Sequence, residues 1–218
     1  LSARLDDPFG YGRVIRGEDG AVAAVVEERD ADEAQRAVCE INSGAYWFDA
    51  AFLAKALEGL TPKNAQGEYY LTDTVAASNA AGLRAGAFVW ADADMTLGAN
   101  DRRQLRTLNE IARMRVLERH LDNGVDIPCF DGVMIAPDVQ IEHDAQVLPG
   151  TVLRGNTRIG AHSVIGPNSY VENSIIGADT RVLASYITDS TVGSGTRIGP
   201  FTQLRPDSHI GDGVKIGY

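Results

Sequence analysis

Cysteines, long apolar segments and positive charge are all scarce in this sequence, and each scarcity excludes a class of protein. Cys39 and Cys129 lie far apart without the spacing of a metal site, so we expect buried or semi-buried thiols and no disulfide or zinc scaffold. No apolar run approaches the roughly 20 residues that a membrane-spanning helix needs. The net charge of −10 argues against general nucleic-acid binding. We therefore expect a cytoplasmic protein with no membrane insertion and no nucleic-acid partner.

The segment 135–218 carries a repeat of six residues. One aliphatic side chain returns at each step, and the spacing shortens to five in places between Val171 and Val192. A period of six fits neither an α-helix nor a single alternating strand, but it fits a solenoid of triangular coils with three short strands each. We expect these side chains to point inward and to stack on their copies in the next coil. They are Ile135, Ile141, Val147, Leu153, Ile159, Ile165, Val171, Ile176, Val182, Ile187, Val192, Ile198, Leu204, Ile210 and Ile216.

Small residues and glycines support a solenoid. Glycine often follows the aliphatic residue directly, which relaxes the backbone at the corners. The spacing does not identify a function, because a structural module without catalysis could carry the same repeat. Four positions after the aliphatic residue, a small or β-branched residue recurs, as a cramped interior would need: Ala145, Thr151, Thr157, Ser163, Ser169, Thr180, Thr196, Thr202, Ser208 and Val214.

The first 100 residues predict an α/β domain, because strand patterns alternate with helix patterns. Asp19-Gly20 is the turn signal of a hairpin between the first two strands. Asp30 is expected to cap the first helix. The predicted strands are 12–16, 21–27, 40–49 and 87–90, and the predicted helices are 30–38, 50–60 and 72–81.

Residues 101–123 form the strongest predicted helix, which Asp101 can cap and Asn123-Gly124 can end. We interpret its arginines as a solvated surface with pairs such as Arg106 with Glu110, and not as an anion site. The segment 101–124 is therefore predicted to connect an α/β domain (1–100) to a solenoid domain (125–218). The arginines are Arg102, Arg103, Arg106, Arg113, Arg115 and Arg119.

Five short motifs occur in a fixed order along the chain. Together with the repeat, they resemble the family of bifunctional bacterial enzymes that are both N-acetylglucosamine-1-phosphate uridyltransferase and glucosamine-1-phosphate acetyltransferase. The resemblance runs along the whole chain. The motifs are Leu5-Asp6-Asp7-Pro8-Phe9-Gly10-Tyr11-Gly12-Arg13, Glu40-Ile41-Asn42-Ser43-Gly44, Asn64-Ala65-Gln66-Gly67-Glu68-Tyr69-Tyr70-Leu71-Thr72-Asp73, Gly98-Ala99-Asn100-Asp101-Arg102 and Ile198-Gly199-Pro200-Phe201-Thr202-Gln203-Leu204-Arg205-Pro206.

This resemblance implies a fold, two reactions and a set of partners. The implied fold is part of a Rossmann-like nucleotidyltransferase domain, a connecting helix, and the first coils of a left-handed parallel β-helix. The β-helix domain would acetylate glucosamine-1-phosphate with acetyl-CoA, and the other domain would transfer UMP from UTP to give UDP-N-acetylglucosamine, a cell-wall precursor. The implied cofactor is Mg²⁺. The implied partners are sugar phosphates, nucleotides and two further copies of the chain in a homotrimer.

Five residues correspond to substrate-binding positions of that family. Gly12 matches a glycine whose N–H meets the sugar nucleotide, since a residue without Cβ permits close approach. Glu27 and Asn42 match sugar-contacting side chains, which offer acceptors and donors to hydroxyl and N-acetyl groups. Asn100 matches a substrate contact that is also a Mg²⁺ ligand. Arg205 matches a sugar-phosphate contact, and a guanidinium can bind phosphate through two hydrogen bonds.

Each of these residues also has a simpler explanation when the resemblance is set aside. Gly12 could be a turn glycine, Glu27 a charge at a strand end, Asn42 a satisfied polar group in a sheet, and Asn100 a loop or cap residue. None of the histidines of the repeat matches the family's general base, and no catalytic residue is assigned in this chain. We interpret these histidines as corner residues, and Glu142 and Arg154 as surface residues; the histidines are His143, His162 and His209.

The family's phosphate-holding loop and its acetyl-transfer base have no counterpart in this sequence. No charged and then apolar segment begins at Leu1, so the sequence predicts no secretory signal. Phosphoryl transfer depends on positioning and charge neutralisation. We therefore expect an internal fragment that is catalytically inactive alone. The alternatives are another sugar-1-phosphate nucleotidyltransferase with a β-helix domain, and a non-catalytic trimerising module.

Overall fold

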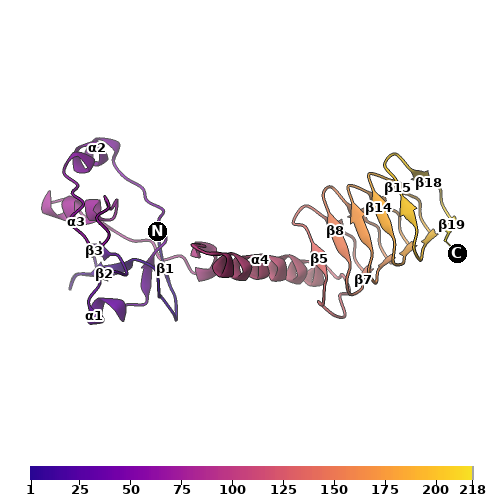
Figure 1. The fold of residues 1–218 in the computed structure, drawn as a ribbon, viewed down its shortest axis with the longest axis horizontal. Helices are drawn as coiled ribbons and strands as arrows, with labels where there is room; N and C mark the ends of the chain where they lie inside the picture. Colours follow the sequence, from indigo (N-terminus) through magenta and orange to yellow (C-terminus); the bar gives the residue numbers. More distant parts are fainter. Residues whose placement is uncertain (218) are drawn as a thin grey trace. The chain divides into compact units, whose positions relative to one another are not determined.

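Stacked strands of two or three residues form a solenoid from β5 to β19, in the computed structural model, which describes residues 1–217 (Figure 1). The strands make three parallel five-stranded sheets. The first holds β7 (Gln146–Val147), β10 (Val164–Ile165), β13 (Arg181–Val182), β16 (Arg197–Ile198) and β19 (Lys215–Ile216). The second holds β5 (Met134–Ile135), β8 (Val152–Arg154), β11 (Tyr170–Glu172), β14 (Tyr186–Thr188) and β17 (Gln203–Leu204). The third holds β6 (Gln140–Ile141), β9 (Arg158–Ile159), β12 (Ile175–Ile176), β15 (Thr191–Val192) and β18 (His209–Ile210).

The register between strands confirms the predicted inward positions. Leu153 pairs with Ile135 in the preceding coil and with Val171 in the following one. The shortened steps also hold, because Ile187 pairs with Val171 and with Leu204. Twelve of the fifteen predicted aliphatic residues are buried, and the other three, Ile141, Ile210 and Ile216, are partly buried and pack against the same core. The segment from β5 to β19 is therefore a parallel β-helix, as predicted.

Small polar residues fill the rest of the interior, and their hydroxyl groups bond to the backbone of the neighbouring coil. The Ser163 hydroxyl donates to the Gly177 carbonyl at 2.8 Å, and the Thr180 hydroxyl donates to the Gly193 carbonyl at 2.9 Å. Where the spacing shortens to five, this position is taken by a serine that the six-residue count did not find. These serines are Ser174, Ser185 and Ser190, all buried.

Helix α4 (Arg102–Asp122) begins at the predicted cap, because Asp101 Oδ1 accepts from the N–H groups of Arg103 and Gln104, each at 2.8 Å. Leu117 on its last turns is fully buried in the hydrophobic core of the solenoid. The chain divides into two compact units, Leu1–Leu105 and Arg106–Tyr218, so this part of α4 belongs with the solenoid.

Two arginines of α4 contradict the prediction of a purely solvated surface. Arg113 donates to the carbonyls of Phe130 and Val133 at 3.1 and 3.0 Å. Arg119 donates to the carbonyl of Pro137 at 2.8 Å. Glu110, which was expected to pair with Arg106, forms its ion pair with Arg113 instead. These guanidinium groups satisfy carbonyls of the first coil, which has no preceding coil to bond to.

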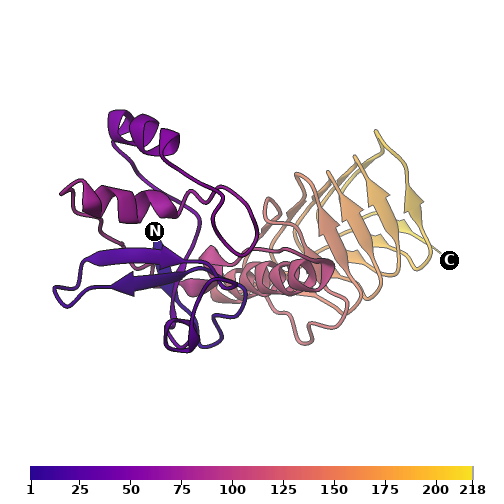
Figure 2. The same cartoon turned by 60° about the vertical axis from the view of Figure 1, so that its left-hand side comes forward.

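The unit Leu1–Leu105 contains a four-stranded antiparallel sheet in the order β1-β4-β2-β3, with three helices. Helix α3 packs against β3, and α2 packs against α3, on one side of the β2–β3 hairpin (Figure 2). The strands are β1 (Ser2–Arg4), β2 (Arg13–Arg16), β3 (Val22–Val26) and β4 (Glu40–Asn42). The helices are α1 (Glu33–Arg36), α2 (Ala50–Glu58), α3 (Asp73–Ala80) and the 3₁₀ turn η1 (Ala93–Thr96).

The small α/β region is present as predicted, with differences at several boundaries. Strand β1 was not predicted, and residues 87–90 form no strand, because only Val89 bridges to Ser2. Asp32, not Asp30, caps α1: its side chain accepts from Gln35 N, and the Gln35 side chain accepts from Asp32 N. Cys39 is exposed and not buried, whereas Cys129 is partly buried. Within residues 1–217, no helix has the length and apolar character needed to cross a bilayer.

Glycines at the coil corners provide a test of the stacking. A Cβ at Gly160 would lie 2.5 Å from Ala178 N, whereas a Cβ at Gly211 would meet nothing within 4 Å. We expect Gly160→Ala to lower the free energy of unfolding by about 2 kcal/mol, because coils would have to separate. Gly211→Ala, at the equivalent corner, should change it little. Denaturant unfolding measures both, and equal stability of the two variants would contradict the account.

Candidate functional site

Gly12 lies where the β2–β3 hairpin meets β4. It is buried, and its carbonyl accepts from Asn42 N–H at 2.8 Å. Its φ is not in the left-handed region, so the need for glycine is one of space. A Cβ at this position would lie 3.3 Å from both carboxylate oxygens of Glu27. The structure therefore brings together three of the predicted site residues, Gly12, Glu27 and Asn42.

Glu27 directly follows β3 and is partly buried. Its carboxylate accepts from the Thr72 hydroxyl at 3.3 Å, and Thr72 stands at the N-terminus of α3. Burial raises the pKa of Glu27 above its ordinary value, and the carboxylates of Asp30 and Asp73 raise it further. The pKa of Asp73 is raised by burial and by Asp30 as well. The site therefore favours a Glu27 carboxyl group that is either neutral or hydrogen-bonded. A hydroxyl or amide group of a ligand would provide such a hydrogen bond.

Asn42 and Tyr46 line the same region. Asn42 Oδ1 accepts from Gly44 N–H at 3.1 Å, which fixes the orientation of the side chain. Burial raises the pKa of Tyr46 to about 12. The Tyr46 hydroxyl is buried near Asn42 and Glu27, but it meets no partner with ordinary hydrogen-bond geometry among residues 1–217. Buried hydroxyl groups usually have a hydrogen-bond partner. The Tyr46 hydroxyl therefore remains available for a hydrogen bond beside Asn42 and Glu27.

Asn100 is tethered to the same region through Tyr11. The Tyr11 hydroxyl donates to the carbonyl of Gly98 at 3.3 Å and accepts from its N–H at 3.0 Å. Gly98 precedes Asn100 by two residues, and Tyr11 precedes Gly12 by one. The Asn100 N–H donates to Gln104 Oε1 at 2.6 Å, which holds the loop against the start of α4.

The residues around Asn100 do not by themselves form a magnesium site. Asn100 offers one amide oxygen, and the adjacent Asp101 carboxylate is used to cap α4. Within the described range 1–217, no group of three or more histidine, cysteine or acidic side chains is placed to hold a metal ion. Mg²⁺ prefers six oxygen ligands in octahedral geometry. These residues could therefore supply a minor part of such a site at most.

Arg205 lies in the solenoid unit, in the column of residues that directly follow the inward side chain. Its side chain is exposed, and its carbonyl accepts from the hydroxyl groups of Ser190 and Ser208 at 2.9 and 2.6 Å. The register of β8, β11, β14 and β17 places Arg154, Glu172 and Thr188 in the coils before it. An exposed guanidinium at this position can bind an anionic ligand through two hydrogen bonds.

Two histidines of the repeat, His143 and His162, lie at turns as predicted, whereas the prediction is wrong for His209, which lies on strand β18. His143 Nδ1 lies 2.7 Å from Asp144 Oδ2, and the His143 ring contacts the His162 ring edge to face at 5.8 Å. His162 has a φ of 59°, and His209 is exposed on β18. A cavity of about 440 Å³ between α2 and α3 shares only Asp73 with the region around Gly12. It is therefore separate from the candidate site.

Sequence reasoning missed Thr72, Tyr11 and Tyr46 as members of this region. Thr72 and Tyr11 stand inside motifs that the sequence analysis singled out, so their positions were visible. Their contacts were not, because Thr72 and Glu27 are 45 residues apart in the chain, and Tyr11 and Gly98 are 87 apart. Only the fold brings these pairs within hydrogen-bond distance.

Comparison with known proteins gives similarity along the whole chain. A bifunctional protein GlmU from Clostridioides difficile is 43% identical over 217 residues, which is all of this chain and 47% of that protein. Another from Caldanaerobacter subterraneus subsp. tengcongensis is 46% identical over 210 residues, 96% of this chain and 46% of that protein. A third from Streptococcus thermophilus is 42% identical over 217 residues. The chain thus spans about half the length of the curated relatives it matches.

A family model also matches the solenoid. It is described as GMPPB C-terminal domain and covers residues 135–218. The match begins at Ile135, the first aliphatic residue of the repeat. It therefore concerns the coils and not the region around Gly12.

The raised pKa of Glu27 predicts that a neutral side chain would stabilise the fold at pH 7. Above the raised pKa, the native protein holds a charged carboxylate that burial disfavours. Below the ordinary value of 4.5, the carboxyl group is neutral in both the folded and the unfolded chain. We expect Glu27→Gln to raise the melting temperature at pH 7, with the difference vanishing as the pH falls to 4.5 and below.

Thermal unfolding across this pH range measures the difference. The exposed Glu18 in the same unit provides the matched control, Glu18→Gln, for which we expect no comparable stabilisation. A Glu27→Gln protein that is less stable than the native chain at pH 7 would contradict the argument.

Proposed function

Since this chain is a relative, along its whole length, of the bifunctional GlmU proteins, we propose that it is part of an enzyme of UDP-N-acetylglucosamine biosynthesis. The region around Gly12, Glu27 and Asn42 binds the N-acetylglucosamine part of the sugar nucleotide. The observation that carries this proposal is the close approach of the Glu27 carboxylate to Gly12, where a Cβ would lie 3.3 Å from both carboxylate oxygens. A backbone N–H, a carboxyl group and an amide then surround one ligand.

The two reactions belong to the two units. The unit that contains Gly12 takes part in UMP transfer from UTP to N-acetylglucosamine-1-phosphate, with Asn100 as a ligand of Mg²⁺ and of the sugar nucleotide. The solenoid takes part in acetyl transfer from acetyl-CoA to glucosamine-1-phosphate, and Arg205 contacts the phosphate. Mg²⁺ would neutralise phosphate charge when it is bound. Residues 1–100 then correspond to part of a sugar nucleotidyltransferase domain, 101–124 to a connecting helix and 125–218 to the first coils of an acetyltransferase domain.

A second candidate is another sugar-1-phosphate nucleotidyltransferase with a β-helix domain. Its support is weaker, because the whole-chain relatives share the bifunctional name, whereas the differently named family model covers 135–218 alone. A panel of sugar nucleotides in the binding assay below would distinguish the two, since the proposed function requires a preference for UDP-N-acetylglucosamine.

We expect the chain to bind UDP-N-acetylglucosamine without forming it from UTP and N-acetylglucosamine-1-phosphate. Gly12→Ala should weaken binding at least tenfold (about 1.4 kcal/mol or more), because its Cβ would occupy the space beside Glu27. Gly86→Ala is the matched control, since a Cβ there meets nothing within 4 Å. Calorimetric titration measures the affinity. Absence of binding by the native chain would refute the proposal, and turnover by this chain alone would refute its inactivity.

We further propose that the solenoid assembles as a homotrimer through the face of β11 and β14. Tyr170 and Tyr186 stack there with ring centroids 4.6 Å apart, and Phe201 beside them is 83% exposed. Exposed aromatic groups of this kind favour burial against another surface.

Sedimentation analysis provides the test of this assembly. Tyr186→Lys should convert trimers to monomers, because it places a charge in the apolar contact. Thr191→Lys, an equally outward position on β15, should leave the trimer intact. A native chain that sediments only as a monomer would contradict the proposal.

A further inference from the structure

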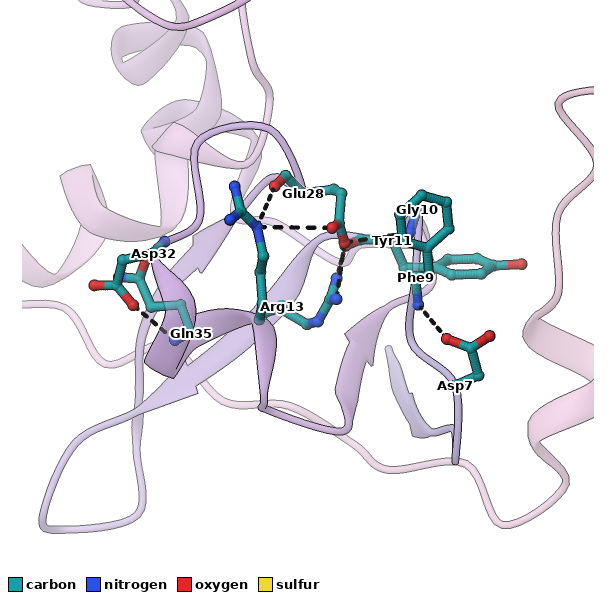
Figure 3. A network of polar contacts seen from close by, with 9 residues as sticks. Asp7, Phe9, Gly10, Tyr11, Arg13, Glu28, Asp32 and Gln35 are labelled. Atoms are coloured by element: carbon teal, nitrogen blue, oxygen red, sulfur yellow. Dashed lines mark hydrogen bonds and ion pairs between the residues drawn. The ribbon is translucent and has the colours of Figure 1, made fainter.

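Arg13 is a buried charge next to the candidate ligand contact. It is 2% exposed, and its Nη2 lies 2.8 Å from Glu28 Oε2. Its Nη1 donates to the carbonyl of Tyr11 (Figure 3). Its Nε has no hydrogen-bond partner among residues 1–217. A buried guanidinium with incomplete pairing contributes little net stability. Arg13 therefore matters more for the backbone geometry that it imposes than for the stability of the fold.

Glu28 links Arg13 to the backbone of Gly10. Glu28 Oε2, which pairs with Arg13, also accepts from the N–H of Gly10 at 3.2 Å. The other carboxylate oxygen lies 3.8 Å from Arg36 Nε. The pair therefore holds the Gly10 N–H and the Tyr11 carbonyl, which belong to the two residues immediately before Gly12 (Figure 3).

Holding the Tyr11 carbonyl also sets the direction of the Gly12 N–H. The two groups belong to one planar trans peptide unit, in which the C=O and the N–H point in opposite directions. The carbonyl points to the Arg13 guanidinium, so the Gly12 N–H points away from it. Gly12 is buried, yet its N–H donates to no group among the described residues, whereas its own carbonyl is bonded to Asn42 N–H.

We propose that Arg13, together with Glu28, is a positioning residue that orients the Tyr11–Gly12 peptide and keeps the Gly12 N–H available to an oxygen atom of the ligand. This inference rests on the proposed function for the identity of the ligand, a sugar nucleotide. Arg13 does not touch the ligand and acts through the peptide. A buried backbone donor left unbonded is unfavourable, and the paired arginine prevents the peptide from rotating to relieve it.

The same strand offers a matched control. Arg16, also on β2, forms a two-point ion pair with Glu40 through distances of 2.7 and 2.8 Å. Its remaining bond goes to the carbonyl of Gly20, in the hairpin turn at the other end of the strand. Arg16→Lys therefore perturbs a comparable ion pair without touching the Tyr11–Gly12 peptide.

The test compares Arg13→Lys with Arg16→Lys in the full chain, by two measurements. Titration with UDP-N-acetylglucosamine should show about tenfold weaker binding for Arg13→Lys, because a single ammonium nitrogen cannot occupy the two positions from which Nη2 bonds Glu28 and Nη1 bonds the Tyr11 carbonyl. Arg16→Lys should bind within roughly twofold of the native chain. In two-dimensional NMR without ligand, the Gly12 amide resonance should move or broaden in Arg13→Lys and stay in place in Arg16→Lys.

The outcomes separate this inference from the proposed function. If the native chain binds and the two lysine variants bind equally, the role of Arg13 is overturned while the proposed function stands. If the native chain does not bind, the proposed function fails, and an unchanged Gly12 resonance in Arg13→Lys would overturn the positioning role as well. Should Arg13→Lys not fold, Glu28→Gln replaces it. This variant keeps the side-chain shape and should move the Gly12 resonance through the loosened ion pair.

Discussion

Hydrogen bonding between successive coils is the constraint on which the solenoid depends. Each coil must lie one strand spacing, about 4.8 Å, from the next for its N–H groups to reach the neighbouring carbonyls. Gln146 N donates to Ser163 O at 2.8 Å, and Val164 N donates to Thr180 O at 2.9 Å. At this spacing each inward aliphatic side chain rests on its copy, and the positions between the sheets hold small or β-branched side chains. A change of side-chain size would therefore affect the packing of the coils on both sides.

A stack of coils must also end, and the first coil shows how. Its carbonyl groups face no earlier coil, and unbonded buried carbonyls are unfavourable. Helix α4 covers this end with Leu117 in the core, while Arg113 and Arg119 donate to carbonyl groups at the edge. The helix therefore does more than connect two segments of sequence. It supplies the donors that another coil would have supplied.

The sequence predicted the solenoid better than the antiparallel sheet for a physical reason. Each inward residue, such as Leu153, makes the same contact in every coil, so periodicity alone identifies it. The short strand β1 has no such period, and it forms only because β4 offers it an edge. The aliphatic residues identified the shortened steps of five residues. Ser174, Ser185 and Ser190 were missed because in a shortened step the small residue no longer lies four positions after the aliphatic one. Asp32 was passed over as a helix cap because Asp30 two positions earlier satisfied the same rule.

For the candidate site, the motifs predicted which residues gather, but not how the backbone between them is held. Gly12, Glu27 and Asn42 lie together as the motifs implied, since two adjacent strands and the end of a third meet there. Arg13 was passed over because its neighbour Gly12 matched the expected contact, and a charged residue in a strand normally faces solvent. Arg13 is buried because it faces the side of the hairpin on which Glu28 lies. No pattern in the sequence shows which side that is.

The end of β3 carries both a residue proposed to contact the ligand and a residue that holds the backbone next to it. Glu27 directly follows β3, and Glu28 begins the turn after it. The Glu27 carboxyl group lies beside Gly12 and is hydrogen-bonded to Thr72. Glu28 faces Arg13 and the turn before Gly12. One strand end thus places a ligand-facing carboxyl group and an anchoring carboxylate on the two sides of the same short backbone segment. Changing Glu27 would therefore remove a proposed ligand contact, whereas changing Glu28 would loosen the backbone that presents Gly12.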